Sequence, residues 1–285
     1  MRWVSVVQVS AVAAVAAATF ALASSPPVEG QARASGIPRI NGKPNLNGLW
    51  QAMNSANWDI EPHSAKPALA MRPGPIVPVP AKEVIALGAV GSVPSGIGVI
   101  EGDALPYTPE GLKKKQDNQA NWLTRDPEIK CYLPGVPRAT YMPYPFQIVQ
   151  SRDNIIFAYE FTSASRVVRM NTQEKSPAPA WMGWNVGKWD GESLVIEVTD
   201  HMPDTWFDRA GNYHSDALKV TERYTAIDAN TLDYEATIED PNVFSRPWKI
   251  KMPLYRRREP NMQLMEYKCV EFTEELLYGH LRKKP

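Results

Sequence analysis

The chain carries no net charge. Its 285 residues contain 31 lysines and arginines against 31 aspartates and glutamates. Domains that bind nucleic acid or an anionic membrane surface need a basic face or tract. The charge balance therefore excludes nucleic acid as an expected partner and gives no sign of binding to an anionic membrane.

The motifs of several common enzyme classes are also absent. The sequence has no Gly-x-Gly-x-x-Gly motif, no phosphate-binding loop and no Gly-x-Ser-x-Gly nucleophile elbow. It has neither the His-Glu-x-x-His motif of zinc enzymes nor the Cys-x-x-Cys-His motif of haem attachment. Nucleotide, haem and standard serine or zinc hydrolase chemistry thus lack support, and we expect no cofactor.

Long apolar runs are confined to the N-terminus. Arg2 precedes an apolar run from Ala11 to Leu22, and Ala21-Leu22-Ala23 has the small-x-small pattern of a signal peptidase site. We expect residues 1–23 to be a signal peptide; a later cleavage site at Ala32-Arg33-Ala34 and an uncleaved anchor are the alternatives. The run is too short and too rich in alanine for a comfortable membrane span. An exported protein, periplasmic or extracellular and without integral membrane association, is the expectation.

Cysteine is scarce, with only Cys131 and Cys269 present. An even pair in an oxidising compartment predicts a disulfide. The alternative is a catalytic cysteine, but neither residue lies in a motif that contains a histidine.

Proline is abundant, with 26 residues, and it divides the chain. Residues 24–106 are rich in proline, glycine, alanine and serine, so we expect an extended segment that wraps over a later core. Thr108 as N-cap and Pro109 at the first helical position predict a helix at the start of the following domain, residues 107–285.

Short strands dominate the rest of the chain, because apolar residues alternate or run between turn residues. Asp190-Gly191 predicts a hairpin with a type I′ turn, and Asp228-Ala229-Asn230 predicts a second hairpin. Roughly eight strands connected up and down suggest a mainly β fold, a closed antiparallel barrel, with Glu274–Leu281 as a short terminal helix. The predicted strands are Phe146–Gln150, Asn154–Thr162, Arg166–Met170, Trp184–Trp189, Ser193–Thr199, Leu218–Ile227, Leu232–Glu239, Trp248–Leu254 and Met262–Phe272.

Several segments resemble known proteins. Gly48-Leu49-Trp50 is similar to the Gly-x-Trp entry to the first strand of lipocalin-like (calycin) barrels. A longer similarity, to a large family of exported, largely uncharacterised bacterial proteins, rests on the runs Cys131–Arg138, Val186–Glu192, His214-Ser215 with Glu222-Arg223, and Ile238–Pro241 with Pro247-Trp248. The resemblance implies a lipocalin-like barrel with a hydrophobic cavity and carries no catalytic assignment. The loop Asn171–Trp181 departs from the family pattern, because it lacks the expected Asp-Gly turn.

A long loop between two predicted strands, residues 200–216, holds two of the four histidines. His214 can titrate near neutral pH, and Asp208 or Asp216 could hold its tautomer, the arrangement of a general base. The alternative is a structural loop whose aspartates cap turns. A metal site formed by His201 and His214 with Asp204 and Asp208 is a third possibility, although the spacing matches no recognised ligand pattern.

Two glutamates stand out by their phase on predicted strands. Glu222 shares a face with Leu218, Val220 and Tyr224, and Glu160 shares one with Ile156 and Ala158. A carboxylate buried among apolar side chains has a raised pKa unless a cation pairs with it, so both glutamates are candidates for acid or base chemistry. The alternative for each is a structural ion pair with Arg138, Arg166 or Arg223.

Other residues are candidates for ligand binding. Arg138 lies in a stiff aromatic segment with Tyr141 and Tyr144, where it could hold a carboxylate, phenolate or carbonyl group or simply stack on a ring. Trp184 and Trp206 could line an apolar pocket, or they could serve packing alone.

Three functions remain open from the sequence. The first is a binding protein that holds an apolar or aromatic small molecule in the barrel. The second is a cofactor-free isomerase, lyase or hydrolase in which His214 works with a buried glutamate and Arg138. An envelope interaction protein is the third. For the enzyme, we expect His214, Glu222 and Arg138 to meet at one cavity.

Overall fold

The structure is a computed structural model that describes residues 36–65, 71–72, 79–80 and 93–273. The chain divides into two units, residues 1–36 and residues 37–285. The predicted signal peptide and the predicted terminal helix lie outside the described residues. Every element below belongs to the second unit.

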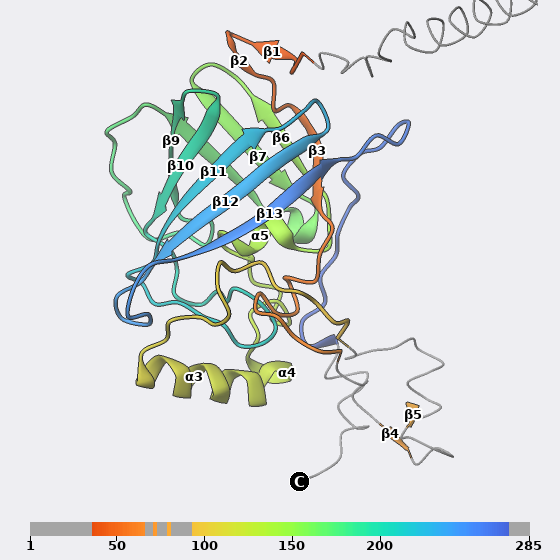
Figure 1. The fold of residues 1–285 in the computed structure, drawn as a ribbon, viewed down its shortest axis with the longest axis vertical. Helices are drawn as coiled ribbons and strands as arrows, with labels where there is room; N and C mark the ends of the chain where they lie inside the picture. The colour runs from red at the N-terminus through yellow and green to blue at the C-terminus, as the bar shows by residue number, and fades with distance from the viewer. Residues whose placement is uncertain (1–35, 66–70, 73–78, 81–92, 274–285) are drawn as a thin grey trace, which may run out of the picture. The chain divides into compact units, whose positions relative to one another are not determined.

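Nine strands close into one barrel (Figure 1). Around the barrel their order is β10, β11, β12, β13, β3, β6, β7, β8 and β9, and β9 pairs with β10 to close the ring. The strands are β3 (Gly48–Ala52), β6 (Phe146–Gln150), β7 (Asn154–Tyr159), β8 (Ser165–Met170), β9 (Trp184–Asp190), β10 (Ser193–Thr199), β11 (Lys219–Ala226), β12 (Thr231–Glu239) and β13 (Trp248–Arg256).

Alternating burial shows why these segments form barrel strands. Along β6 and β12 buried residues alternate with more exposed ones, so one face of each strand lines the interior. The interior face carries the core, which runs from Trp50 on β3 to Leu254 on β13. Eight of the nine predicted strands are present, with bounds within three residues of the prediction.

The barrel is mixed, which corrects the expectation of a purely antiparallel one. β8 and β9 run parallel, with Arg169 opposite Val186 and Met170 opposite Gly187. All other neighbouring strands are antiparallel. A parallel pair cannot be joined by a tight turn, so residues 171–183 return over the outside of the barrel.

The N-terminal segment contributes a barrel strand, whereas we expected it to wrap a finished barrel. β3 lies between β13 and β6 and completes the ring. The prediction of a last strand at Met262–Phe272 is wrong, because that segment forms no strand. With β3 paired beside β13, no barrel edge is left for it.

The turn at Asp190-Gly191 joins β9 and β10 as predicted, but the turn type differs. Asp190 pairs with Ser193, so Gly191 and Glu192 are the central residues. Only Gly191 has a positive φ, +60°. A type I′ turn needs two such residues, whereas glycine at the first central position is the pattern of type II′.

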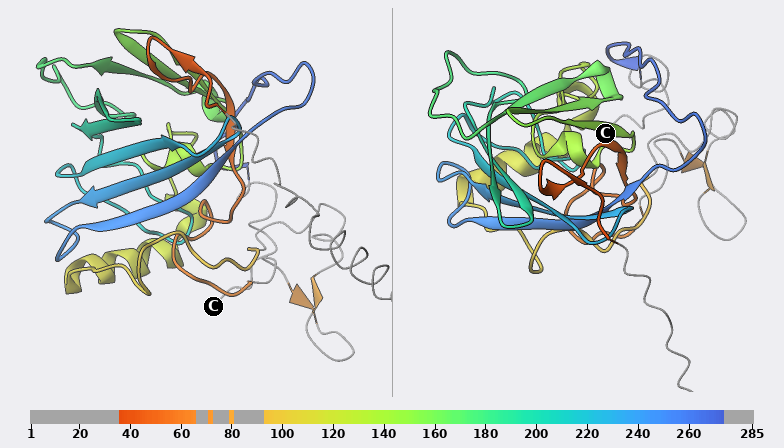
Figure 2. Two further views of the ribbon diagram at one scale, coloured as in Figure 1. Left: turned by 45° about the horizontal axis from the view of Figure 1, so that its top comes forward. Right: turned by 90° about the horizontal axis from the view of Figure 1, so that it is seen from above.

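The part of the chain that the structure describes contains three α-helices. The prediction of a helix after Thr108 is confirmed: α3 spans Pro109–Ala120, and the Thr108 hydroxyl accepts a hydrogen bond from the Gly111 amide. α4 (Trp122–Arg125) follows it, and the four residues of α5 (Arg138–Tyr141) are buried against the barrel (Figures 1 and 2). The remaining elements of the described ranges are the two-residue pairs β1 (Arg39–Ile40) with β2 (Lys43–Pro44) and β4 (Met71–Arg72) with β5 (Val79–Pro80), and the 3-10 turn Phe161–Ser163.

Cys131 and Cys269 form the predicted disulfide, with Cα atoms 5.7 Å apart. Such bonds persist in oxidising compartments, which favours a location outside the cytoplasm. Within the described residues, no helix is long and apolar enough to span a membrane.

Candidate functional site

Glu222 lies inside the barrel, as its phase on β11 predicts. Its side chain is completely buried, in line with Val220 and Tyr224. The cation beside it is Arg166 of β8, one of the three arginines that the sequence offered. Arg166 Nη1 lies 2.5 Å from Oε2 of Glu222, and Nη2 lies 3.1 Å from Oε1. The hydroxyls of Tyr224 and Tyr234 donate to the same Oε1 at 2.9 and 2.8 Å.

Arg166 uses all five of its N–H donors. Besides the two bonds to Glu222, Nε donates to the Tyr159 hydroxyl at 2.9 Å, Nη1 to Asn185 Oδ1 at 2.9 Å and Nη2 to the Tyr224 hydroxyl at 3.1 Å. The guanidinium also lies over the ring of Phe157, 4.4 Å from its centroid. A buried ion pair is tolerated when its remaining donors and acceptors are satisfied in this way.

The tyrosines of this cluster act as hydrogen-bond donors. Burial raises the pKa of Tyr159 to about 12, and it raises the pKa values of Tyr224 and Tyr234 well above their usual range. The phenols therefore stay protonated at physiological pH, and they supply no base. We call Arg166, Glu222, Tyr159, Tyr224 and Tyr234 the interior polar cluster.

Arg138 does not join the interior polar cluster, contrary to the prediction. From α5, its Nη1 lies 3.0 Å from Asp126 Oδ1 and its Nη2 lies 2.6 Å from Glu128 Oε2, while Nε donates to Asn57 Oδ1 at 3.0 Å. Burial works against the ionisation of Glu128, but Arg209 and Arg138 outweigh it and lower the pKa of Glu128 to about 2. Arg138 thus ties α5 to the neighbouring loops, and the ligand-holding role has no direct support.

His214 is buried and fully engaged. Its Nδ1 lies 2.8 Å from the Ser215 carbonyl oxygen, and its Nε2 lies 2.5 Å from Thr205 Oγ1. A carbonyl oxygen only accepts, so Nδ1 carries the proton and Nε2 accepts from Thr205. Burial lowers the pKa of His214, which favours this neutral form. Neither Asp208 nor Asp216 holds the ring, and neither ring nitrogen is open for a general base.

Asp208 caps its own loop, which was the alternative interpretation. Its carboxylate accepts from the backbone amides of Ile60, Ala210 and Asn212 and from the Asn212 side chain. Burial, together with the nearby carboxylate of Asp59, raises the pKa of Asp208 to about 7. The residue secures residues 208–212 against the N-terminal segment.

His201 lies beside His214, with ring centroids 5.8 Å apart. Neither ring nitrogen of His201 makes a well-formed hydrogen bond with a described residue, and Trp248 Nε1 is unpartnered in the same sense. Burial lowers the pKa of His201 to about 3, and the Val198 backbone opposes only part of this shift. Among the described residues, no group of three or more histidine, cysteine, aspartate or glutamate side chains could hold a metal ion. The proposed His201–His214 metal site therefore has no support.

We expect His201 to make the fold sensitive to acid. Its pKa is about 3 in the folded protein against 6.5 for an unperturbed histidine, so the unfolded state binds more protons between these values. Stability from this group is complete above pH 6.5 and declines as the pH falls towards 3, by ~2 kcal/mol at pH 5. Urea unfolding at pH 8 and pH 5 measures the loss.

The variant His201→Phe should lose less stability than the parent between these two pH values, by roughly that amount. His63→Gln, at a partly exposed histidine, should keep the parent's loss. An unchanged loss in His201→Phe would show that the acid sensitivity has another source.

Glu160 is not buried in the barrel, because its assumed phase is that of the outer face. Ile156 on that face is 41% exposed, whereas Ile155 and Phe157 point inward. Glu160 itself follows the end of β7 in a helical conformation and accepts a hydrogen bond from the Met265 amide. Its role is to hold the C-terminal segment.

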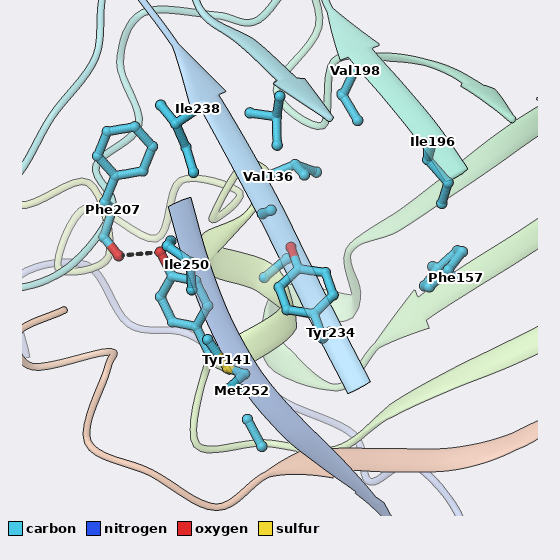
Figure 3. Close-up of a cluster of buried hydrophobic side chains, with 14 of the residues drawn as sticks. Val136, Tyr141, Phe157, Ile196, Val198, Phe207, Tyr234, Ile238, Ile250 and Met252 are labelled. Carbon is cyan, nitrogen blue, oxygen red and sulfur yellow. Dashed lines mark hydrogen bonds between the residues drawn. The ribbon is translucent and has the colours of Figure 1, made fainter. Parts of the chain in front are cut away.

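The two tyrosines predicted to bind a ligand, Tyr141 and Tyr144, lie in different environments. Tyr141 is buried and donates to the Phe207 carbonyl oxygen at 2.8 Å (Figure 3). Tyr144 is only partly buried and packs against Phe161 and Tyr267. None of these three contacts involves the interior polar cluster.

The two tryptophans that the sequence offered for ligand binding also lie in different parts of the structure. Trp206 is buried and pairs through its backbone with Tyr213. Trp184 is on the outer face of β9, because Asn185 and Gly187 take the inward positions. Trp184 therefore faces away from the barrel interior, and any pocket that it lines is on the outside of the barrel.

The predicted trio of His214, Glu222 and Arg138 is distributed over three hydrogen-bond networks. One contact brings the networks of Arg138 and Glu222 close together. The Thr140 hydroxyl of α5, two residues from Arg138, lies 3.5 Å from the Tyr224 hydroxyl. Sequence reasoning missed Tyr234 as a partner of Glu222. The hairpin around residues 228–230 carried a signal, since its register places Tyr234 directly opposite Tyr224.

Comparison with known proteins adds no assignment. No family model matches the chain, and no curated protein matches it significantly. The functional argument therefore depends on the geometry of the barrel.

Proposed function

We propose that the protein is an exported, lipocalin-like barrel that binds an apolar or aromatic small molecule in its interior. The observation that carries the proposal is a continuous group of aromatic rings on the inward faces of β6, β7, β11 and β12. Phe146 contacts Phe157 at 6.2 Å between centroids, Phe157 contacts Tyr224 at 5.4 Å, and Tyr224 contacts Tyr234 at 4.9 Å. These rings are completely buried in the barrel, and aromatic side chains are typical lining residues of small-molecule sites.

The interior polar cluster favours a ligand without a strong charge. Arg166 has no donor left for an anion, and Glu222 already accepts from Arg166 and two phenols. In this proposal the cluster fixes the rings of Tyr159, Tyr224 and Tyr234, and the ligand contacts their faces. Figure 3 shows Phe157 and Tyr234 within one cluster of buried side chains.

Titration with the neutral fluorescent probe N-phenyl-1-naphthylamine tests this function. We expect a saturable rise in fluorescence with one probe per chain. Ala236→Leu should weaken binding, because Ala236 is fully buried on the inward face of β12, next to Tyr234 in phase and opposite Glu222 in register. Thr237→Leu, on the outward face of the same strand, is the matched control and should bind as the parent does.

Unfolding midpoints of both variants guard against a trivial loss of structure, since overpacking an interior costs ~1–3 kcal/mol. Saturable binding that Ala236→Leu weakens and Thr237→Leu does not supports the proposal. No binding to the folded parent, or equal binding by both variants, contradicts it.

A further inference from the structure

The segment that joins β8 to β9 forms one wall of a groove on the outside of the barrel. It leaves the barrel at Asn171, whose amide donates to the Gly187 carbonyl oxygen, and it returns at Ala180, which pairs with the backbone of Asp200 and His201. Between these points the segment stands away from β9 and β10 (Figures 1 and 2). The groove beneath it has a volume of about 750 Å³, the size of a typical small-molecule site.

The groove is separate from the barrel interior. Its floor is the outer face of the sheet, where Trp184 and Lys188 of β9 lie beside Glu197 of β10. Its wall is the start of the connecting segment, residues 171–176.

The charges of the groove are unevenly satisfied. Glu197 pairs with Lys219 at 3.0 Å, and Glu174 lies 4.0 Å from Arg169. Lys175 and Lys188 line the groove as well, and the ammonium group of neither makes a hydrogen bond or ion pair with any residue in the described ranges. The Asp200 carboxylate also lines the groove and accepts a hydrogen bond from the Thr199 hydroxyl at 2.7 Å. The groove therefore presents two ammonium groups that have no partner among the described residues, while Glu197 and Glu174 already have cations.

Trp184 supplies a fixed aromatic surface in the same groove. Its Nε1 donates to the Glu174 carbonyl oxygen at 3.1 Å, and the guanidinium of Arg169 lies 4.0 Å from its ring centroid. These two contacts set the orientation of the indole. Because Arg169 covers one face of the indole, the ring surface that Trp184 contributes to the groove is the part that Arg169 leaves uncovered.

We propose that this groove binds an acidic saccharide. The apolar face of a sugar ring would pack on Trp184, and its carboxylate would accept charge-assisted hydrogen bonds from Lys175 and Lys188. The Thr221 hydroxyl, which also lines the groove, is a partner for a sugar hydroxyl, and the Thr199 hydroxyl, which donates to Asp200, can still accept from one. A saccharide fits better than a purely apolar molecule, because hydroxyl, amide and ammonium groups surround the one aromatic ring.

Calorimetric titration of the full chain with tri-galacturonic acid at low salt is the test, and maltotriose serves as the neutral comparison of equal ring number. We expect saturable binding of the acidic trisaccharide only. Lys175→Gln and Lys188→Gln should each weaken it about three- to fivefold, and the double variant about tenfold. Lys251→Gln removes an equal charge from the outer face of β13, where Lys251 pairs with Asp233, and should leave the affinity within twofold.

Trp184→Ala should also weaken binding, and it separates stacking from general attraction of anions. If Trp184→Ala or the lysine double variant binds tri-galacturonic acid as tightly as the parent does, this groove is not the binding site. No binding of tri-galacturonic acid, or equal binding of maltotriose, overturns the assignment of an acidic saccharide.

Discussion

Replacing Glu222 by leucine should destabilise the protein by about 3–5 kcal/mol, the cost of leaving one member of a buried ion pair without its partner. Arg166 would keep its charge in a fully buried position, and the hydroxyls of Tyr224 and Tyr234 would lose their acceptor. Urea unfolding at neutral pH, followed by circular dichroism and tryptophan fluorescence, measures the change. A large loss is expected because water cannot replace the carboxylate in the interior.

The neighbouring residue on the same strand provides the control. Arg223 points outward and pairs with Asp190 in an exposed salt bridge, so Arg223→Ala should cost less than about 1 kcal/mol. Combining Glu222→Leu with Arg166→Met removes both charges, and this double variant should be more stable than Glu222→Leu alone. A Glu222→Leu variant as stable as Arg223→Ala would show that the ion pair does not hold the barrel together.

The strand pattern was predictable because a barrel imposes a simple rule on the sequence. Residues alternate between interior and solvent, and polar turns interrupt the alternation, so Phe146–Gln150 and Ser193–Thr199 could be placed to the residue. The same rule placed Glu222 inside. It failed for Glu160, because the phase was carried past the end of β7, where the chain turns into a helical conformation.

Partners across the barrel could not be predicted in the same way. That Arg166 and not Arg138 meets Glu222 depends on β8 and β11 facing each other across the interior, and local pattern does not encode this. The position of β3 is equally non-local: a strand of five residues, Gly48–Ala52, closes the ring between two strands that come much later in the chain.

Reducing the disulfide should have an effect as large as that of Glu222→Leu. Cys131 and Cys269 are 138 residues apart in sequence, and closing so long a loop contributes about 4–5 kcal/mol in the chain-entropy model. We expect the urea midpoint of the fully reduced protein to fall accordingly, and the Cys131→Ser/Cys269→Ser variant to match the reduced parent. Comparing the two separates the bond itself from the substitutions.

The folded barrel should survive this loss in the absence of urea, because the bond lies outside the strands. Cys131 belongs to the loop that carries Glu128, and Cys269 belongs to the segment after β13, where the Phe272 amide donates to the Ile129 carbonyl oxygen. The far-ultraviolet β signal should therefore persist on reduction, while protease cleavage after β13 should become faster. A midpoint that shifts by less than the equivalent of about 1 kcal/mol would mean that the unfolded chain gains little freedom when the bond opens.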